Sequence, residues 1–129
     1  MIEADDTRTK RISAPPLAPA EPVIDHAHLA RMTLGDARLE AEVLALFDRQ
    51  ATLLLGRMEG ATPAAIAAFA HTLKGSARGI GTWRVAAAAQ LVEEAARASA
   101  TAELADTVRR LAIAVREVQA AIQELTAPR

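Results

Sequence analysis

Cysteine and tyrosine are absent from the 129 residues, and aromatic residues make up only 2% of them. Without cysteine the chain has neither disulfides nor thiolate chemistry, which fits a reducing compartment. No apolar run approaches the roughly 20 residues that a membrane helix needs, and no signal-peptide pattern opens the sequence. We therefore expect a cytoplasmic protein that does not insert into membranes.

An excess of charge of either sign is also missing. The 15 basic and 16 acidic residues give a formal net charge of −1. Such a chain has no electrostatic field to gather nucleic acid and no basic stripe to hold a membrane surface. We expect it to bind neither.

Hydrophobic residues are abundant, at 51%, and with so few aromatics they are mostly alanine, leucine and valine. This composition favours helices over sheets, and the length fits one domain. The opening "MIEADDTRTKRISAPPLAPAEP" mixes charges with prolines and has no apolar period, which is typical of a flexible tail. A proline-rich docking peptide is the alternative, although no PxxP repeat with flanking basic anchors stands out beyond Pro16 and Pro19. We assign residues 1–22 to the tail and 23–129 to the domain.

Capping residues and apolar periods divide the domain into five expected helices. They are a short one capped by Asp25 to about Met32, a long one capped by Asp36 to near Gly60, one from Thr62 and Pro63 toward Gly79, one from Trp83 to about Ala98, and a last one capped by Thr101. The second carries Leu39, Val43, Leu46, Phe47, Leu54 and Met58 at helical spacing. The last carries Leu104, Val108, Leu111, Val115, Val118, Ile122 and Leu125.

Short links between long amphipathic helices make neighbours antiparallel. The sequence therefore predicts an all-α, up-and-down four-helix bundle, with the short first helix as a lid at one end. We expect Leu34 and this first helix to close the core. Trp83 could either cover the bundle end or contact a partner.

His71 stands opposite the apolar face of the third helix. Counting about 100° per residue from His71, the apolar side chains fall between about 160° and 260°. They are Ile66, Phe69, Ala70, Leu73, Ala77 and Ile80. The strip around His71 instead carries small or basic residues, namely Ala64, Ala67, Ala68, Lys74, Gly75 and Arg78. Taken alone, an exposed histidine is most often an ordinary surface residue.

Gly75 argues for more than an ordinary surface. A glycine inside a helix costs about 1 kcal/mol relative to alanine, and alanine is used freely around it. A side chain there would obstruct something that must come close. We interpret Gly75, with Ala64, Ala67 and Ala68, as a docking surface beside the histidine.

The chemistry of the strip suits a phosphoryl group. A neutral imidazole is a competent nucleophile, and Lys74 would place an ammonium beside the phosphoryl oxygens, with Arg78 as a weaker second cation. The sequence has no GxxxxGK[ST] loop and no carboxylate cluster for magnesium, so the phosphoryl group must come from a partner. His26 and His28, two residues apart on a helix, face different ways, and we expect no metal site.

The stretch "AHTLKGSARGIG" resembles the H-x-L-K-G-[SA] signature of the histidine-containing phosphotransfer domain of bacterial phosphorelays. The likeness extends over about Val23 to Leu125. It implies a transient phosphohistidine on His71, exchanged with aspartates in receiver domains of a hybrid histidine kinase or of response regulators. It implies no cofactor, since magnesium belongs to the receiver. Lys74 and Gly75 match the family lysine and glycine.

The same resemblance assigns two further features. Gly81 matches the family's second glycine, whereas Gly79 departs from the common pattern and leaves the end of that helix open. A polar residue on the following helix often orients the imidazole. Glu93 is the first candidate and Gln90 the second.

Two functions remain open. One is a monomeric phosphotransfer protein, neither an ATP-using kinase nor a hydrolase. Related domains begin chemotaxis kinases, but no kinase portion follows here, so we expect a free-standing shuttle. The other is a helical adaptor that docks on a kinase or receiver and leaves the histidine unused. The intact signature favours the first.

Overall fold

The computed structural model describes residues 22–127, so the predicted tail lies, apart from Pro22, outside the described part. This part folds into five helices and contains no strand. They are α1 His26–Met32, α2 Ala37–Met58, α3 Pro63–Ile80, α4 Trp83–Arg97 and α5 Thr101–Thr126. The all-α prediction is confirmed, and every expected helix is present. None of these helices is long and apolar enough to cross a membrane.

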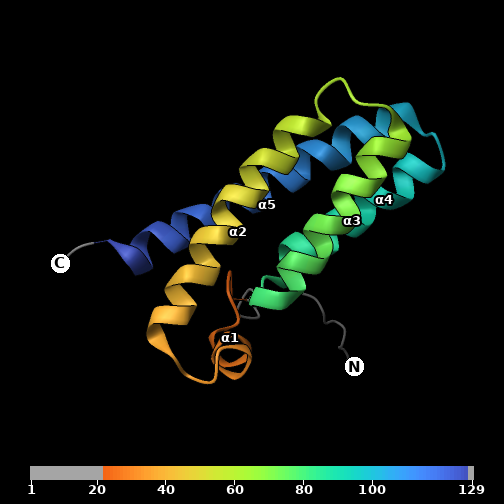
Figure 1. Ribbon diagram of the computed structural model, residues 1–129. Coiled ribbons are helices and arrows are strands. Elements are labelled where there is room, and N and C mark those ends of the chain that lie inside the picture. The colour runs from red at the N-terminus through yellow and green to blue at the C-terminus, as the bar shows by residue number, and fades with distance from the viewer. Residues whose placement is uncertain (1–21, 128–129) are drawn as a thin grey trace, which may run out of the picture.

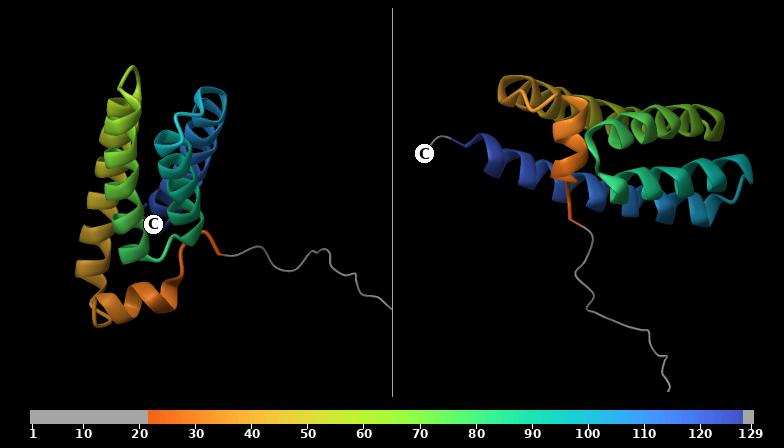
Figure 2. Two further views of the ribbon diagram at one scale, coloured as in Figure 1. Left: turned by 90° about the vertical axis from the view of Figure 1, so that its right-hand side faces the viewer. Right: turned by 90° about the horizontal axis from the view of Figure 1, so that it is seen from below.

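The four long helices form the predicted up-and-down bundle (Figure 1). Helix α2 packs against α3 and α5, and α4 packs against the same two helices. Helix α1 lies across one end of the bundle, near the turn between α3 and α4, as the two turned views show (Figure 2). The short first helix is therefore a lid, as expected.

Side-chain caps begin the first three helices. Asp25, Asp36 and Thr62 each accept a hydrogen bond from the backbone N–H three residues further on. The predicted cap of the last helix is wrong, because Thr101 is its first residue and Ala100 precedes it without a side-chain cap. Ser99, with a φ of 53°, ends α4 in the left-handed conformation. Only Ala100 then lies between Ser99 and the start of α5, so Thr101 enters the first turn.

One face of each long helix supplies the core. In α2 the buried residues are Leu44, Phe47, Ala51, Leu54 and Met58. Leu39 and Leu46, which share the expected apolar period, are instead 40% and 58% exposed. The apolar stripe of α2 is therefore wider than the face that α3 and α5 cover.

Leu34 does not help to close the core, contrary to expectation. It is 92% exposed, and its φ of 55° places it in the left-handed turn between α1 and α2. This turn directs the side chain toward solvent. Ile24 and Leu29 close this end instead, since they are 2% and 1% exposed.

Gly81 makes the turn between α3 and α4. Its φ is 83°, and its N–H donates to the carbonyl of Ala77 at 3.0 Å, which ends α3 one residue beyond Gly79. A Cβ at Gly81 would lie 3.0 Å from the backbone oxygen of Asp25. Both the left-handed backbone and the close approach of the chain before α1 require glycine here.

Helices α3 and α4 pack most extensively, and the buried face of each includes alanines. Several buried alanines lie about one helical turn from the polar residues described below. They are Ala70 and Ala77 on α3, and Ala86, Ala89 and Ala96 on α4. Because methyl side chains let helix axes approach closely, a side chain on one helix can reach the other. This packing brings the polar groups of the two helices together.

Candidate functional site

His71 stands on the outer side of α3. The opposite face of this helix is buried through Ile66, Ala70, Leu73, Ala77 and Ile80. That packing fixes the rotation of α3 and leaves the His71 side chain 68% exposed. An incoming group can therefore reach the imidazole.

The strip around His71 is not uniformly open to solvent. Ala64, Ala68, Gly75 and Arg78 are exposed, as the helical period indicates. Ala67 is half-buried and packs against the core. The strip therefore has one open side and one side that turns toward α4.

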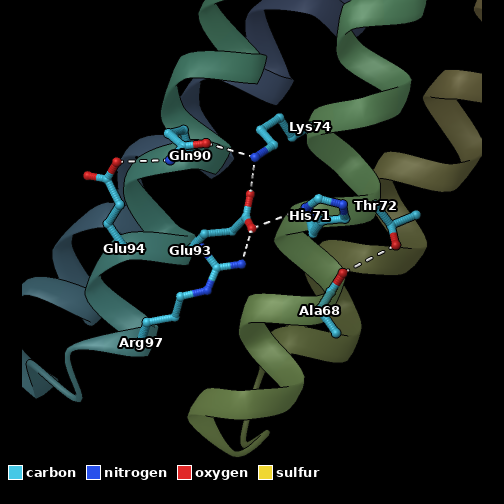
Figure 3. A network of polar contacts seen from close by, with 8 residues as sticks. All are labelled: Ala68, His71, Thr72, Lys74, Gln90, Glu93, Glu94 and Arg97. Atoms are coloured by element: carbon cyan, nitrogen blue, oxygen red, sulfur yellow. Dashed lines mark hydrogen bonds and ion pairs between the residues drawn. The ribbon is translucent and has the colours of Figure 1, made fainter.

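Glu93 reaches His71 from α4, and its carboxylate is the centre of the polar network (Figure 3). Its Oε2 lies 3.1 Å from Nδ1 of the imidazole. The Glu93 side chain is fully buried, at 0% exposure. Of the two candidates for orienting the imidazole, Glu93 is the one that the fold brings into contact with it.

Lys74 turns toward α4 instead of lying open beside the histidine. Its side chain is 12% exposed, and Nζ lies 2.6 Å from Oε1 of Glu93. Nζ also donates to Oε1 of Gln90 at 2.7 Å. Gln90, the second orienting candidate, thus contacts Lys74 and not His71, and its amide donates onward to Glu94 at 2.9 Å.

The surroundings of Glu93 keep it ionised. Burial alone would raise the pKa of its carboxyl, but the contacts with Lys74 and His71 outweigh burial and hold the pKa below its usual value. The pairing between Lys74 and Oε1 is an ion pair without good hydrogen-bond geometry. At neutral pH the site therefore holds a buried carboxylate.

Arg97 is a member of this network that the sequence analysis did not identify. Its guanidinium donates to Oε2 of Glu93 at 2.8 Å, one turn further along α4. Two signals in the sequence could have found it. Glu93 falls among the buried apolar positions of its helix, and Arg97 follows it at the i,i+4 spacing of a helical ion pair.

Arg78 lies two turns beyond His71, in the last turn of α3. Its backbone carbonyl lies 2.9 Å from Nε2 of His28. Its side chain is exposed on the same strip as His71. Its assignment as a phosphoryl-stabilising group stays a prediction.

Gly75 has open space where a side chain would begin. A Cβ built there meets no atom within 4 Å, and the residue lies in the middle of α3. Nothing inside the described fold therefore requires glycine at this position. Gly75 differs in this respect from Gly81, whose surroundings and backbone both demand it.

A shallow groove opens on the α2 side of α3. Its lining consists of Val43, Leu46, Phe47, Gln50, Ser76 and Ile80. By the helical period, Gly75, Gly79 and Thr72 occupy the surface between His71 and this groove. An apolar depression therefore adjoins the strip that carries the histidine.

Trp83 covers the bundle end, which is the first of the two possibilities for this residue. Its indole donates to Oδ2 of Asp25 at 3.1 Å. Its ring packs edge-on against His28, with ring centroids 4.9 Å apart. Together with Gly81, these residues form the end cluster, which fastens α1 to the α3–α4 turn.

Within residues 22–127, no group of three or more histidine or acidic side chains could hold a metal ion. Comparison with curated proteins and with solved structures finds no match for the chain. Comparison with protein families finds one: the profile of the Hpt domain matches residues 28–127, which include all the residues of the polar network. The match covers most of the chain and agrees with the helical bundle and the exposed histidine, and we conclude that the protein belongs to the Hpt domain family.

Proposed function

We propose that this protein relays phosphoryl groups between aspartates of receiver domains through a transient phosphohistidine at His71. The observation that carries the proposal is the contact between an imidazole that is 68% exposed and a carboxylate that is fully buried. Membership of the Hpt family indicates a part in phosphorelay signalling. The exchange between receivers is the more specific function, and the geometry of His71 supports it.

The contact with Glu93 selects the nitrogen that attacks. A carboxylate only accepts hydrogen bonds, so Nδ1 of His71, 3.1 Å from Oε2, carries the hydrogen. In a neutral imidazole Nε2 then holds the lone pair. This nitrogen faces away from Glu93 (Figure 3). The nucleophilic atom therefore points toward an incoming group.

In the transfer step, the lone pair on Nε2 of His71 forms a bond to the phosphorus of an aspartyl phosphate. The bond between phosphorus and the aspartate oxygen breaks at the same time, and the aspartate leaves as a carboxylate. The imidazole keeps its hydrogen on Nδ1 and gains positive charge, which the Glu93 carboxylate stabilises. The reverse step delivers the phosphoryl group to a second receiver. No proton has to leave the ring in either direction.

Lys74 is suited to hold the phosphoryl oxygens. An ammonium has three hydrogens; one is donated to Gln90, and the charge is paired with Glu93. A remaining hydrogen can meet an oxygen of the transferred group. With a neutral imidazole, the charges of Glu93, Lys74 and Arg97 sum to one positive charge, which favours a phosphoryl dianion. Arg78 would add a weaker contribution.

We place the receiver on the open side of the His71 strip. Gly75 and Ala68 leave the surface low beside the imidazole, with Ala64 at the start of α3. The adjoining α2–α3 groove offers apolar contacts through Val43 and Leu46. A receiver seated there can bring its phosphorylated aspartate to Nε2. The magnesium ion of this reaction belongs to the receiver, and we assign no cofactor to the chain.

An adaptor that only docks on a kinase or receiver is the alternative function. Such a protein would need the groove but not the polar network. The buried carboxylate favours transfer, because removing Glu93 from water is costly and its partners all gather around His71. As a phosphotransfer module the chain would work as a monomer in the cytoplasm, without ATP-dependent kinase activity of its own.

The deciding experiment offers the purified protein to a panel of receiver domains carrying labelled aspartyl phosphate. Transfer of the label to the wild-type chain, and its absence from the His71→Gln variant, is the expected result. The label should be lost in acid and kept in alkali, as a phosphoramidate is. Alkali-labile label would reveal an acyl phosphate and overturn the assignment. Receiver binding without label transfer would favour the adaptor.

A further inference from the structure

Two groups share one oxygen of the buried carboxylate. Oε2 of Glu93 lies 2.8 Å from the guanidinium of Arg97 and 3.1 Å from Nδ1 of His71. Oε1 faces Lys74 at 2.6 Å. Each oxygen of the carboxylate therefore has a cationic partner, and Arg97 binds the same oxygen that contacts the imidazole.

Packing does not explain the position of Arg97. Its side chain is 64% exposed, so it contributes little to the core. Its place in the last turn of α4 would suit any cation, because the helix dipole favours positive charge there. That general effect would not, however, direct the guanidinium to one oxygen of Glu93. The hydrogen bond to Oε2 therefore needs a separate explanation.

Without Arg97, Glu93 would keep Lys74 as its cationic partner, on Oε1. The carboxylate could then rotate toward the ammonium, because a charged pair in a buried site attracts strongly. Rotation would move Oε2 away from Nδ1. The imidazole would lose the acceptor that fixes its hydrogen, and both neutral tautomers would become populated.

We propose that Arg97 is a positioning residue for phosphotransfer, which holds Oε2 of Glu93 against Nδ1 of His71 and thereby keeps Nε2 as the attacking nitrogen. This inference rests on the proposed function of His71. Arg97 acts through Glu93 and has no contact of its own with the imidazole in this arrangement.

The first test measures the tautomer directly and needs no partner protein. Nitrogen-15 NMR of the imidazole distinguishes hydrogen on Nδ1 from hydrogen on Nε2. We expect Nδ1–H in the wild type, a mixture in Arg97→Ala, and mostly Nδ1–H in Arg97→Lys, because lysine keeps a donor at i,i+4. Arg110→Ala is the matched control, since it removes another exposed arginine, paired with Asp106 at i,i+4. An unchanged tautomer in Arg97→Ala overturns the proposal.

The second test is a double-mutant cycle on the rate of transfer from a phosphorylated receiver. Arg97→Ala should slow transfer on the order of ten- to a hundredfold by misplacing the imidazole. In a Glu93→Gln background the same substitution should have little further effect, since residues that act through one another are not additive. A full effect of Arg97→Ala in both backgrounds would mean that Arg97 meets the receiver or the phosphoryl group itself, which also overturns the proposal.

Failure of the proposed function would look different. If no receiver labels the wild type, His71 is not the relay residue, whatever the NMR spectra show. If the wild type is labelled and Arg97→Ala keeps both its tautomer and its rate, only the inference about Arg97 fails. Melting curves of each variant exclude loss of folding, and the Arg97→Lys comparison remains decisive should Glu93→Gln fail to fold.

Discussion

Glu93 and His71 meet across the α3–α4 interface, with Oε2 of the fully buried carboxylate 3.1 Å from Nδ1 of the exposed imidazole. The pair combines a group that cannot easily move with one that a partner can reach. It also distinguishes the two ring nitrogens, because Nδ1 contacts the carboxylate and Nε2 is the nitrogen to which we assign the attack. The predictions below test this division, the surface around it and the scaffold that carries it.

His71→Gln should abolish phosphoryl acceptance and leave the free energy of unfolding within about 0.5 kcal/mol of the wild type, because an exposed side chain leaves no cavity. Labelling and urea denaturation measure the two quantities. His26→Gln, an exposed histidine on α1, should change neither. Retained labelling of the His71 variant would refute the assignment.

Gly75 should separate stability from function. Gly75→Ala and Gly75→Gln should each raise the free energy of unfolding by about 0.5 to 1 kcal/mol, because both residues favour helix and the site has open space. Gly75→Gln should nevertheless slow transfer on the order of a hundredfold by lifting the receiver from the strip.

Gly56 provides the control for this substitution. It is exposed on α2, and a Cβ there also meets nothing within 4 Å. Gly56→Gln should stabilise the bundle in the same way and leave the transfer rate unchanged. Transfer at the wild-type rate by Gly75→Gln would show that the receiver docks elsewhere.

Leu46→Glu tests the apolar groove between α2 and α3. Leu46 is 58% exposed and lines the groove, so the substitution should cost little stability but weaken receiver docking. We expect a rise in the receiver concentration at half-maximal rate, on the order of tenfold or more, with a smaller effect on the rate at saturation. Ile113→Glu, at a 50% exposed site on α5, should have no effect. Equal effects of both substitutions would indicate general electrostatic repulsion.

Gly81→Ala should destabilise the fold more than Gly60→Ala. Both glycines have positive φ, at 83° and 71°, so alanine costs roughly 1 to 2 kcal/mol of backbone strain at either. Only at Gly81 does the new methyl group press on Asp25, which should add about 1 kcal/mol or more. Denaturant titration of the two variants measures the difference. Equal losses of unfolding free energy in the two variants would mean that α1 moves away from the new methyl group without destabilising the fold.

The end cluster should open in acid. Hydrogen bonds from the His28 backbone and the Trp83 indole lower the pKa of Asp25 below its ordinary 3.8. Because the folded pKa is the lower one, this stabilisation is fully present above pH 3.8 and is lost as pH falls through the folded value. Emission of Trp83, the one tryptophan, should show a step below about pH 4, where the Asp25 carboxylate is lost.

Asp25→Asn is the matched variant for this titration. It keeps the size of the side chain but removes the charge that titrates. Its Trp83 emission should differ from wild type already at neutral pH and lack the acidic step. An acidic step of the same size in Asp25→Asn would place the responsible group elsewhere.

Local chemistry made much of the fold predictable. Asp25, Asp36 and Thr62 identify helix starts because a side-chain oxygen satisfies a backbone N–H within the same few residues. The spacing of apolar residues predicted which face of α3 is buried, because a helix buries its apolar side against whichever element packs on it. Thr101 misled because the left-handed turn at Ser99 has no signal in side-chain type. The prediction that Leu34 closes the core was wrong for the same reason, because its own left-handed conformation has no signal in side-chain type.

The polar network was only partly predictable. The signature on α3 drew attention to His71 and Lys74, and the family resemblance suggested Glu93, with Gln90 second. The direction of Lys74 and the contact of Arg97 depend on how closely α4 approaches α3. That distance follows from packing between helices far apart in the sequence, and no pattern within one helix encodes it.

The alanines between α3 and α4 set that distance. Ala89 and Ala96, 0% and 4% exposed, flank Glu93 one turn on either side, and they act as spacers of one methyl group each. A larger residue at either position would push the helices apart and lengthen the contact between Glu93 and His71, although every polar residue remained in place. The contact between Glu93 and His71 can therefore be lengthened or shortened, in evolution or in the laboratory, from positions that carry only a methyl group.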